Sequence, residues 1–178
     1  MSQDALWVFG YGSLIWRPDI PFVQRVPARL HGWIRRFYQG SPDHRGTMTS
    51  LGRVVTLLRQ EKSYCDGMAY HVAQKDREAV LHYLDVRECG GYERCVVEVS
   101  LRGGGTQRAL FYIATKDNPH YLGEQSPAEM AKHIVHAKGA SGTNLDYFLH
   151  LREAIAKFAP PDPHIEEIYR EVVPFLGD

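Results

Sequence analysis

Two short stretches of the sequence carry the residues best suited to chemistry. The first is "YLDVRECGGYE", residues 83–93, in which Glu88 stands just before a pair of glycines. Val80, Leu84 and Glu88 recur at a four-residue spacing, so a helix that reaches this far places the carboxylate on an apolar stripe. Partial desolvation raises the pKa of a carboxyl group toward the range useful for a general base. The pattern therefore indicates Glu88 as a candidate proton acceptor.

Three alternatives compete with this interpretation. The helix can end near Val86, which leaves Glu88 as a solvated carboxylate paired with a nearby arginine. Asp85 follows Leu81 by the same four-residue spacing, so periodicity alone does not choose between the two acids. Cys89 is a candidate thiol nucleophile, and nine histidines are present to supply a base, but no local signature surrounds it.

The second stretch is "WVFGYGSLIW", residues 7–16, where Gly10 and Gly12 flank a tyrosine just after an apolar run. A dinucleotide fingerprint needs a third glycine and a helix, and a Walker loop needs a lysine. Pro18 and expected strands follow instead, so no helix N-terminus is expected to hold a pyrophosphate. Two interpretations remain. Either the glycines adopt positive φ in a turn, or successive N–H groups and the Ser13 hydroxyl form a nest for a carboxylate or an oxyanion.

The histidines form no complete metal-binding pattern. His133 and His136 lie three residues apart on an expected helix, a spacing that some metal sites use. No nearby third ligand of the H-E-x-x-H kind accompanies them, so a solvated helix face is the simpler interpretation. His44 lies in an expected loop, and the sequence alone leaves its role open.

These residues must be positioned by strands in the first two-thirds of the chain. The expected strands are short, rich in β-branched or aromatic residues, and separated by Gly, Pro, Asp or Ser. "GGGT" at 103–106 predicts a tight connection between two of them. The expected strands cover residues 5–10, 23–32, 33–39, 53–59, 66–72, 94–101 and 108–115.

Helices are expected around residues 75–86 and through the last third of the chain. Ser126, Pro127 and Glu129 predict a capped helix start, and Gly139 predicts its end. A second helix is expected from about Asn144 to Phe158, and a third after Asp162-Pro163. The pattern predicts an α+β fold, a curved or closed sheet with helices packed against it, in a single domain of residues 1–178. The apolar stripe of the third helix comprises Ile165, Ile168, Tyr169, Val172 and Val173.

Composition excludes several classes of protein. Lys plus Arg and Asp plus Glu each total 21, so the formal net charge is zero and no general attraction to nucleic acid is expected. Arg35 and Arg36 are adjacent, but neighbours on a strand face opposite ways. Three cysteines without a paired spacing predict neither disulfides nor a thiolate zinc site. No signal-like N-terminus and no apolar run of about 18 residues occur, so we expect a cytoplasmic protein without a membrane or obligate protein partner.

Taken together, six motifs occur in the order found in one family. They are "VFGYGSLIWRPD", "RRFYQGSPDHRGT", "GRVVTLL", "YLDVRECGGY", "NPHYLG" and "ASGTNLDYFLHL". From about Trp7 to Leu151 the chain resembles the ChaC-type γ-glutamylcyclotransferases. The resemblance implies a γ-glutamylcyclotransferase-like fold, a small mixed β-barrel with flanking helices, and a helical C-terminal third. It also implies cleavage of glutathione to 5-oxoproline and cysteinylglycine, with no metal or organic cofactor.

The resemblance also implies roles for particular residues. The family's catalytic glutamate matches Glu88, and Arg53 of "GRVVTL" matches a pocket residue. Leu51 stands where many members have proline, and Cys89 stands where many have lysine, which bears on loop geometry and substrate preference. Two other functions stay open: a small-molecule sensing module that uses the same pocket, and a cyclotransferase for other γ-glutamyl compounds. The family's substrate loop matches Val8, Phe9, Gly10, Tyr11, Gly12, Ser13 and Leu14.

Overall fold

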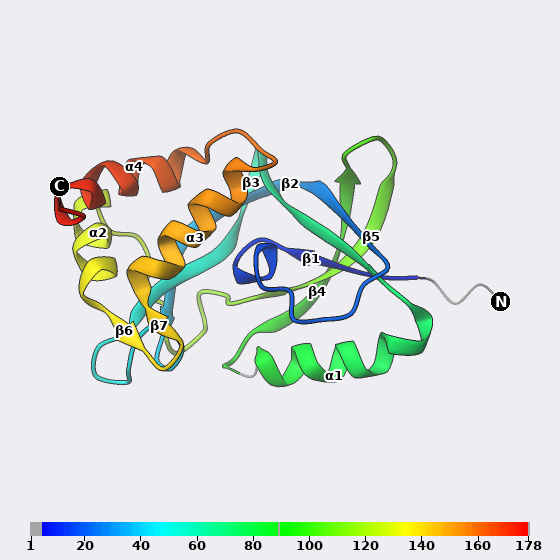
Figure 1. Ribbon diagram of the computed structural model, residues 1–178, viewed down its shortest axis with the longest axis horizontal. Helices are drawn as coiled ribbons and strands as arrows, with labels where there is room; N and C mark the ends of the chain where they lie inside the picture. The colour runs from blue at the N-terminus through cyan, green and yellow to red at the C-terminus, as the bar shows by residue number, and fades with distance from the viewer. Residues whose placement is uncertain (1–4, 89, 178) are drawn as a thin grey trace. The chain divides into compact units, whose positions relative to one another are not determined.

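The computed structural model describes residues 5–88 and 90–177, where five strands form a closed barrel in the order β1-β3-β2-β4-β5 (Figure 1). β1 runs antiparallel to β3, and the parallel pairing of Val8 with Leu110 joins β1 to β5. The predicted α+β barrel is confirmed. Its strands are β1 (Leu6–Gly10), β2 (Gln24–Ser41), β3 (Gly52–Val72), β4 (Glu93–Leu101) and β5 (Thr106–Ile113).

β2 and β3 are much longer than the sequence pattern predicts. Each was expected as two short strands, and each is one continuous strand, of 18 and 21 residues respectively. Gly32 predicted a strand end, but its φ of +78° bends β2 without interrupting it. Lys62, with φ of +62°, lies in the exposed polar middle of β3. Local breaker residues therefore mark bends in this barrel and not strand ends.

The hairpin between β4 and β5 is confirmed. Gly103, Gly104 and Gly105 all adopt positive φ, and Ser100 pairs with Thr106 across the turn. Only glycine adopts this conformation readily, which explains three glycines in succession.

The helix α1 (Arg77–Arg87) connects β3 to β4, after a short 3₁₀ helix η2 (Gln74–Asp76). It lies below β1, β4 and β5 in Figure 1. Its predicted apolar residues Val80 and Leu84 are buried. The helix ends at Arg87, one residue past Val86, and Glu88 is its C-cap, so the alternative of a helix end near Val86 with an arginine partner for Glu88 agrees with the structure, although the Glu88 side chain is only 21% exposed.

The helix α2 (Pro127–His136) begins as predicted, with a complete capping box between Ser126 and Glu129 and a proline in the first turn. Its predicted end at Gly139 is wrong. The helix ends at His136, its C-cap Ala137 has extended backbone, and Gly139 lies in β6 (Lys138–Gly139), which pairs with β7 (Gly142–Thr143). A Cβ on Gly139 would lie 2.5 Å from main-chain atoms of Asp43 and His44, so this glycine is needed for close approach.

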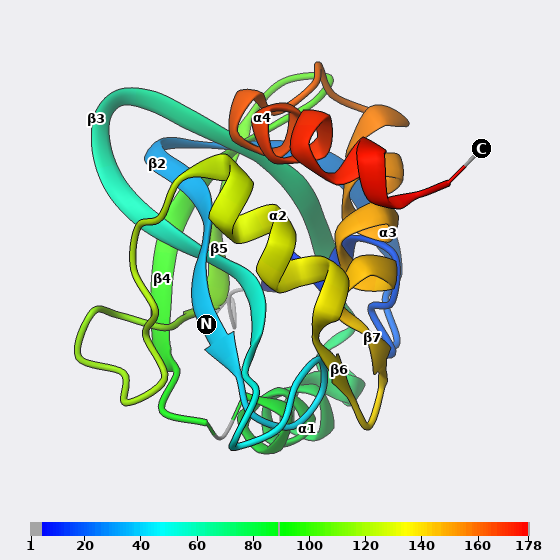
Figure 2. The same ribbon diagram turned by 90° about the vertical axis from the view of Figure 1, so that its left-hand side faces the viewer.

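Two further helices complete the chain. α3 (Asn144–Ala156) is capped by Thr143, and α4 (Pro163–Val172) is capped by Asp162. α2 packs against both of them (Figure 2). The 3₁₀ helix η3 (Val173–Phe175) follows α4 and leaves Val173 exposed, while Ile165, Ile168 and Val172 of the predicted stripe are buried. Among the described residues, no helix combines the length and apolarity needed to cross a membrane.

The chain divides into two compact units. The first unit comprises Met1–Ile34 and Arg59–Thr115, and the second comprises Arg35–Leu58 and Lys116–Asp178. β2 and β3 each contribute residues to both units.

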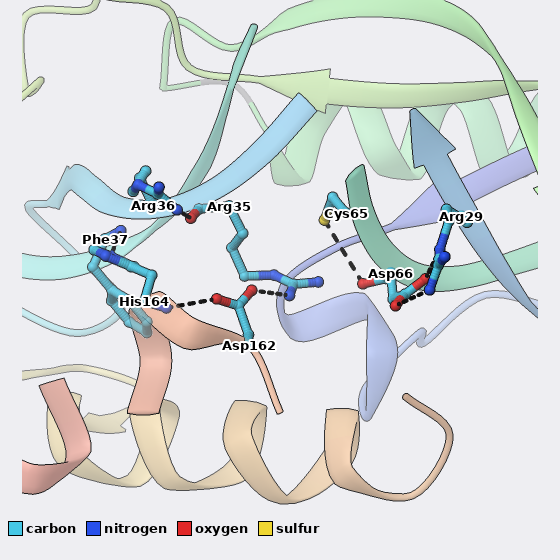
Figure 3. Close-up of polar contacts among 8 residues, drawn as sticks. All are labelled: Arg29, Arg35, Arg36, Phe37, Cys65, Asp66, Asp162 and His164. Atoms are coloured by element: carbon cyan, nitrogen blue, oxygen red, sulfur yellow. Dashed lines mark hydrogen bonds and ion pairs between the residues drawn. The ribbon is translucent and has the colours of Figure 1, made fainter. Parts of the chain in front are cut away.

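The second unit contains a buried polar network (Figure 3). Arg35 is buried and its guanidinium lies 2.9 Å from the Asp162 carboxylate, which also accepts the His164 N–H. The ring Nε2 of His164 accepts the Phe37 N–H at 3.0 Å. Burial, with Arg36 nearby, lowers the pKa of His164 to about 4. Arg35 and Arg36 therefore form no joint basic patch, because Arg35 faces Asp162.

Candidate active site

The glycine loop, residues 8–14, leads from β1 into a 3₁₀ helix, η1 (Ser13–Ile15). The Ile15 N–H donates to the Gly12 carbonyl at 2.9 Å, and the Arg17 N–H donates to the Ser13 carbonyl at 2.8 Å. The expectation that no helix follows the glycines is therefore wrong, although the helix is a single turn. The strand pattern missed it because one turn is too short to show a helical period.

Neither glycine of the loop adopts positive φ, and Gly10 is required for space. Gly12 has φ of −126°, and Gly10 lies in β1, so the positive-φ interpretation is wrong for both. A Cβ on Gly10 would lie 2.7 Å from the Leu14 Cβ, because η1 folds back over the end of β1. Gly10 thus permits the tight return of the chain.

Tyrosines of the barrel hold the loop. The Tyr11 hydroxyl donates to the Tyr112 carbonyl at 2.7 Å, and the Tyr70 hydroxyl donates to the Leu14 carbonyl at 2.5 Å. Burial raises the pKa of Tyr70 to about 12, so its hydroxyl stays protonated and a donor at neutral pH. These two bonds fix the loop through the Leu14 carbonyl and the Tyr11 side chain.

The loop also presents hydrogen-bond donors, its main-chain N–H groups. In the part of the chain that the structure describes, the N–H groups of Gly12, Ser13 and Leu14 donate to no acceptor, as is usual in the first turn of a helix. All three residues are partly exposed. Consecutive donors of this kind suit a carboxylate or an oxyanion, as the nest interpretation predicts.

Glu88 caps the C-terminus of α1, one turn after buried Leu84. Its N–H donates to the Leu84 carbonyl at 2.9 Å, and its side chain is 21% exposed. The Arg87 Nε lies 3.7 Å from the Glu88 Oε1. Arg87 also donates to the Ser13 Oγ at 2.7 Å, so one arginine contacts both the glycine loop and the candidate base. The two stretches singled out in the sequence therefore lie together in the first unit.

Asp85, the competing acid, has structural partners on both of its oxygens. The Arg94 guanidinium bonds to one and the Tyr112 hydroxyl donates to the other. These hydrogen bonds lower the pKa of Asp85, and the bond from Arg94 has the larger effect on that pKa. Burial and the bond to Asp85 raise the pKa of Tyr112 to about 12. Asp85 thus joins α1 to β4 and β5, which leaves Glu88 as the better candidate for proton transfer.

Arg53 lies in the second unit, where its side chain is fully buried. Its guanidinium donates to the Phe37 carbonyl at 2.7 Å, the Gly123 carbonyl at 3.0 Å and the Gln125 Oε1 at 2.6 Å. Burial lowers the pKa of Arg53. These bonds hold the segment before α2 in place, and the assignment of Arg53 to a substrate pocket stays a prediction. Cys89 lies outside the described residues.

The histidines weighed as metal ligands contact the protein itself. The His133 Nε2 lies against the Leu51 carbonyl, and the His136 Nδ1 lies 2.6 Å from the Lys132 carbonyl. His44, left open by the sequence, places its Nδ1 2.9 Å from the Ser141 Oγ. Within residues 5–88 and 90–177, no three His, Cys, Asp or Glu side chains are grouped to hold a metal ion.

Sequence reasoning missed three residues of this site: Arg87, Tyr70 and Tyr112. Arg87 is adjacent to Glu88 in "VRE", and that adjacency was its only local signal. Tyr70 and Tyr112 lie on distant strands that only the closed barrel brings to the loop.

The small closed barrel with its helices is a fold shared with a solved enzyme. The structure of the yeast γ-glutamyl cyclotransferase specific to glutathione has a TM-score of 0.90 at 29% identity, with 97% of each chain covered. The ChaC-like protein family model matches residues 6–174. The chain therefore belongs to the ChaC-like family.

Curated relatives of this family are similar over nearly the whole chain. Glutathione-specific gamma-glutamylcyclotransferase 1 of Danio rerio is 41% identical, over 94% of this chain and 88% of the relative. The glutathione-specific gamma-glutamylcyclotransferase of Schizosaccharomyces pombe is 34% identical, over 96% of this chain and 93% of the relative. The similarity covers both compact units, so it concerns the complete barrel with its helices.

Proposed function

We propose that the chain is a glutathione-specific γ-glutamylcyclotransferase in which Glu88 is the general base and then the general acid. Family membership and the names of the relatives support the reaction and the substrate. The observation that carries the role of Glu88 is its link to the glycine loop: Arg87 contacts the Glu88 carboxylate and the Ser13 hydroxyl together. A base and an anion-binding loop are thereby held in one place.

The glycine loop binds the glutamyl end of the substrate in this proposal. The α-carboxylate of that end accepts hydrogen bonds from the N–H groups of Gly12, Ser13 and Leu14, which need an acceptor. Fixing the glutamyl end holds its α-amine against its own γ-amide carbonyl, where orientation contributes on the order of 7 kcal/mol at best. The whole proposed substrate loop comprises Val8, Phe9, Gly10, Tyr11, Gly12, Ser13 and Leu14.

The reaction needs no nucleophile from the protein. Glu88 removes a proton from the α-ammonium, and the freed amine attacks the γ-carbonyl carbon to close a five-membered ring. The attacking nitrogen then loses a second proton, the amide C–N bond breaks, and Glu88 delivers the two protons in turn to the departing nitrogen. Of the three ammonium protons, one stays on the ring nitrogen of 5-oxoproline, and two reach the cysteinylglycine amine, which leaves as an ammonium. Positioned proton transfer of this kind contributes about 10²- to 10⁴-fold.

Two of three further parts of the proposal rest on the resemblance. Arg53 is assigned to the substrate pocket, and the reaction proceeds without a metal or organic cofactor. The third part, that residues 1–178 act as one domain, is predicted from length and from the pattern of elements. One family model that spans residues 6–174 supports the single domain. A cytoplasmic location is also proposed, from the composition.

Replacing the base tests the mechanism. Glu88→Gln keeps the size of the side chain and removes its ability to accept a proton, so we expect turnover of glutathione to fall at least ~10²-fold. The affinity for glutathione, measured by calorimetry, and the thermal unfolding temperature should both stay near the values of the parent. Glu78→Gln makes the same change at an exposed position in the first turn of α1 and should keep full activity. Near-normal release of 5-oxoproline by Glu88→Gln contradicts the assignment.

A panel of substrates tests the specificity. The parent protein is incubated with glutathione, γ-glutamyl-alanine and γ-glutamyl-lysine, and 5-oxoproline is quantified. Product from glutathione, well above that from the other two, agrees with the proposal. Product only from the other two identifies a cyclotransferase of different specificity, and no product from any identifies a sensing module.

A further inference from the structure

Arg87 makes contacts with three separate parts of the first unit. Its Nη2 donates to the Ser13 Oγ at 2.7 Å, its Nη1 donates to the Arg17 carbonyl at 3.3 Å, and its Nε lies 3.7 Å from the Glu88 Oε1. The three nitrogens of one guanidinium thus contact the start of η1, the segment after it, and the candidate base.

Only arginine among the basic residues can make this set of contacts. Its planar fork directs five N–H groups in fixed directions, whereas the lysine ammonium is a single point that cannot reach all three acceptors. The Arg87 side chain is 18% exposed, so its charge is largely withdrawn from water and its geometry is restrained. Its place in the last turn of α1 also favours a cation, because the C-terminal carbonyls of a helix attract positive charge.

The surrounding fold leaves Arg87 little freedom to move. Two residues earlier, Asp85 joins α1 to Arg94 of β4 and to Tyr112 of β5. On the loop side, the Tyr11 hydroxyl is bonded to the Tyr112 carbonyl. Both the last turn of α1 and the glycine loop are therefore attached to the same strand, and Arg87 connects them directly.

We infer that Arg87 is a positioning residue that holds the Glu88 carboxylate and the glycine loop in the arrangement needed for reaction. The inference rests on the proposed role of Glu88. Arg87 acts through its neighbours: it orients the carboxylate for proton transfer, and it fixes the Ser13 end of the donor loop that binds the glutamyl group. Its loss should therefore affect both turnover and substrate binding.

Two arms of one experiment separate these effects. In the active background, Arg87→Gln is expected to lower kcat for glutathione about 10- to 100-fold, because misplacing a catalytic group by about 1 Å costs rates of this size. In the Glu88→Gln background, where turnover is absent, adding Arg87→Gln is expected to weaken glutathione binding at least about 5-fold by calorimetry, since the loop loses its anchor. Arg87→Lys should restore part of kcat, because it keeps the charge but not the fork.

Controls make the result specific to this residue. Arg108→Gln removes an arginine charge from an exposed position on β5 and should leave kcat and binding unchanged. Thermal unfolding of each variant shows whether the fold is retained, and kcat is compared only among folded variants. An unchanged kcat in the first arm, or unchanged binding in the second, overturns the inference.

The outcome also separates this inference from the proposed function. If Glu88→Gln alone releases 5-oxoproline near the parent rate, the assignment of the base is wrong, whatever Arg87→Gln does. If Glu88→Gln is inactive while Arg87→Gln turns over normally, Glu88 keeps its role and the positioning role of Arg87 is wrong.

Discussion

Gly10 has no room for a side chain, and this sets the path of the glycine loop. Its added Cβ would lie 2.7 Å from the Leu14 Cβ, closer than real Cβ contacts allow, and neither atom lies at the flexible end of a side chain. We expect Gly10→Ala to move η1, to lower stability by about 1–3 kcal/mol, and to raise KM for glutathione. Thermal unfolding and steady-state kinetics measure the two effects.

A second substitution tests the cause of this loss. Leu14→Gly removes the Cβ that the new methyl group meets, so adding Gly10→Ala to that background should destabilise the protein less than it does in the parent. An equal loss in both backgrounds would show that the collision with Leu14 is not the reason.

The sequence indicates the proposed base of this site more readily than the residues that contact it. Helical spacing leaves both Asp85 and Glu88 as candidates and the family motif selects Glu88, which the structure places at the end of α1 in contact with Arg87. Arg87 has no pattern of its own, because its contacts with Ser13 and Arg17 bridge about 70 residues of chain. Spacing along one element does not encode such a contact.

At the scale of the element, Asp85 attaches α1 to the barrel. Its two partners, Tyr112 and Arg94, differ in how far they are buried. Tyr112 is buried, whereas the Arg94 side chain is 44% exposed. Exposed ion pairs contribute little, so the tyrosine hydroxyl should contribute more to holding the helix. We expect Tyr112→Phe to reduce kcat several-fold and Arg94→Gln to have a smaller effect.

Hydrogen exchange locates this effect within α1. The Glu88 N–H, bonded to the Leu84 carbonyl, should exchange faster in Tyr112→Phe than in the parent, because the last turn opens more often. Tyr112→Phe keeps the main-chain carbonyl that the Tyr11 hydroxyl contacts. If Arg94→Gln proves the more damaging variant, the ion pair and not the hydroxyl attaches the helix.

Helix starts and the limits of β1 and β4 were predicted well, whereas the division of β2 and β3 into two strands each was wrong. The cap at Ser126 and the prolines at 127 and 163 act within one turn, so local sequence is sufficient for them. In its local sequence Gly32 is typical of a strand end, but β2 continues through it as part of the closed barrel. Pairing with distant strands overrides local propensity there.

At the scale of the whole molecule, stability should depend on pH through His164. Its pKa is lowered from the ordinary 6.5 to about 4, first by burial and then by the nearby Arg36. Below pH 6.5 the unfolded chain binds a proton that the folded chain does not, so the contribution of His164 to the free energy of unfolding falls as the pH drops from about 6.5 to 4 and is constant below that. The contribution lost is up to ~3 kcal/mol. Chemical denaturation across this range measures it.

A glutamine at this position removes the titration while keeping an acceptor for the Phe37 N–H. His164→Gln should therefore lose most of the pH dependence between 6.5 and 4, although its stability at neutral pH is lower. His31→Gln, at an exposed position, should behave as the parent does. A His164→Gln protein with the parent's full pH dependence would assign the effect to other groups.

The way the chain passes between the two units has a consequence for its synthesis on the ribosome. Residues 35–58 of the second unit interrupt the first, which is completed only by Arg59–Thr115. The Tyr11 hydroxyl finds its acceptor 101 residues later, on the strand that also closes the barrel beside Val8. The Tyr11 bond that holds the glycine loop therefore cannot form until about two-thirds of the chain has been synthesised. Chaperones that shield exposed strands should therefore have a long nascent intermediate to bind.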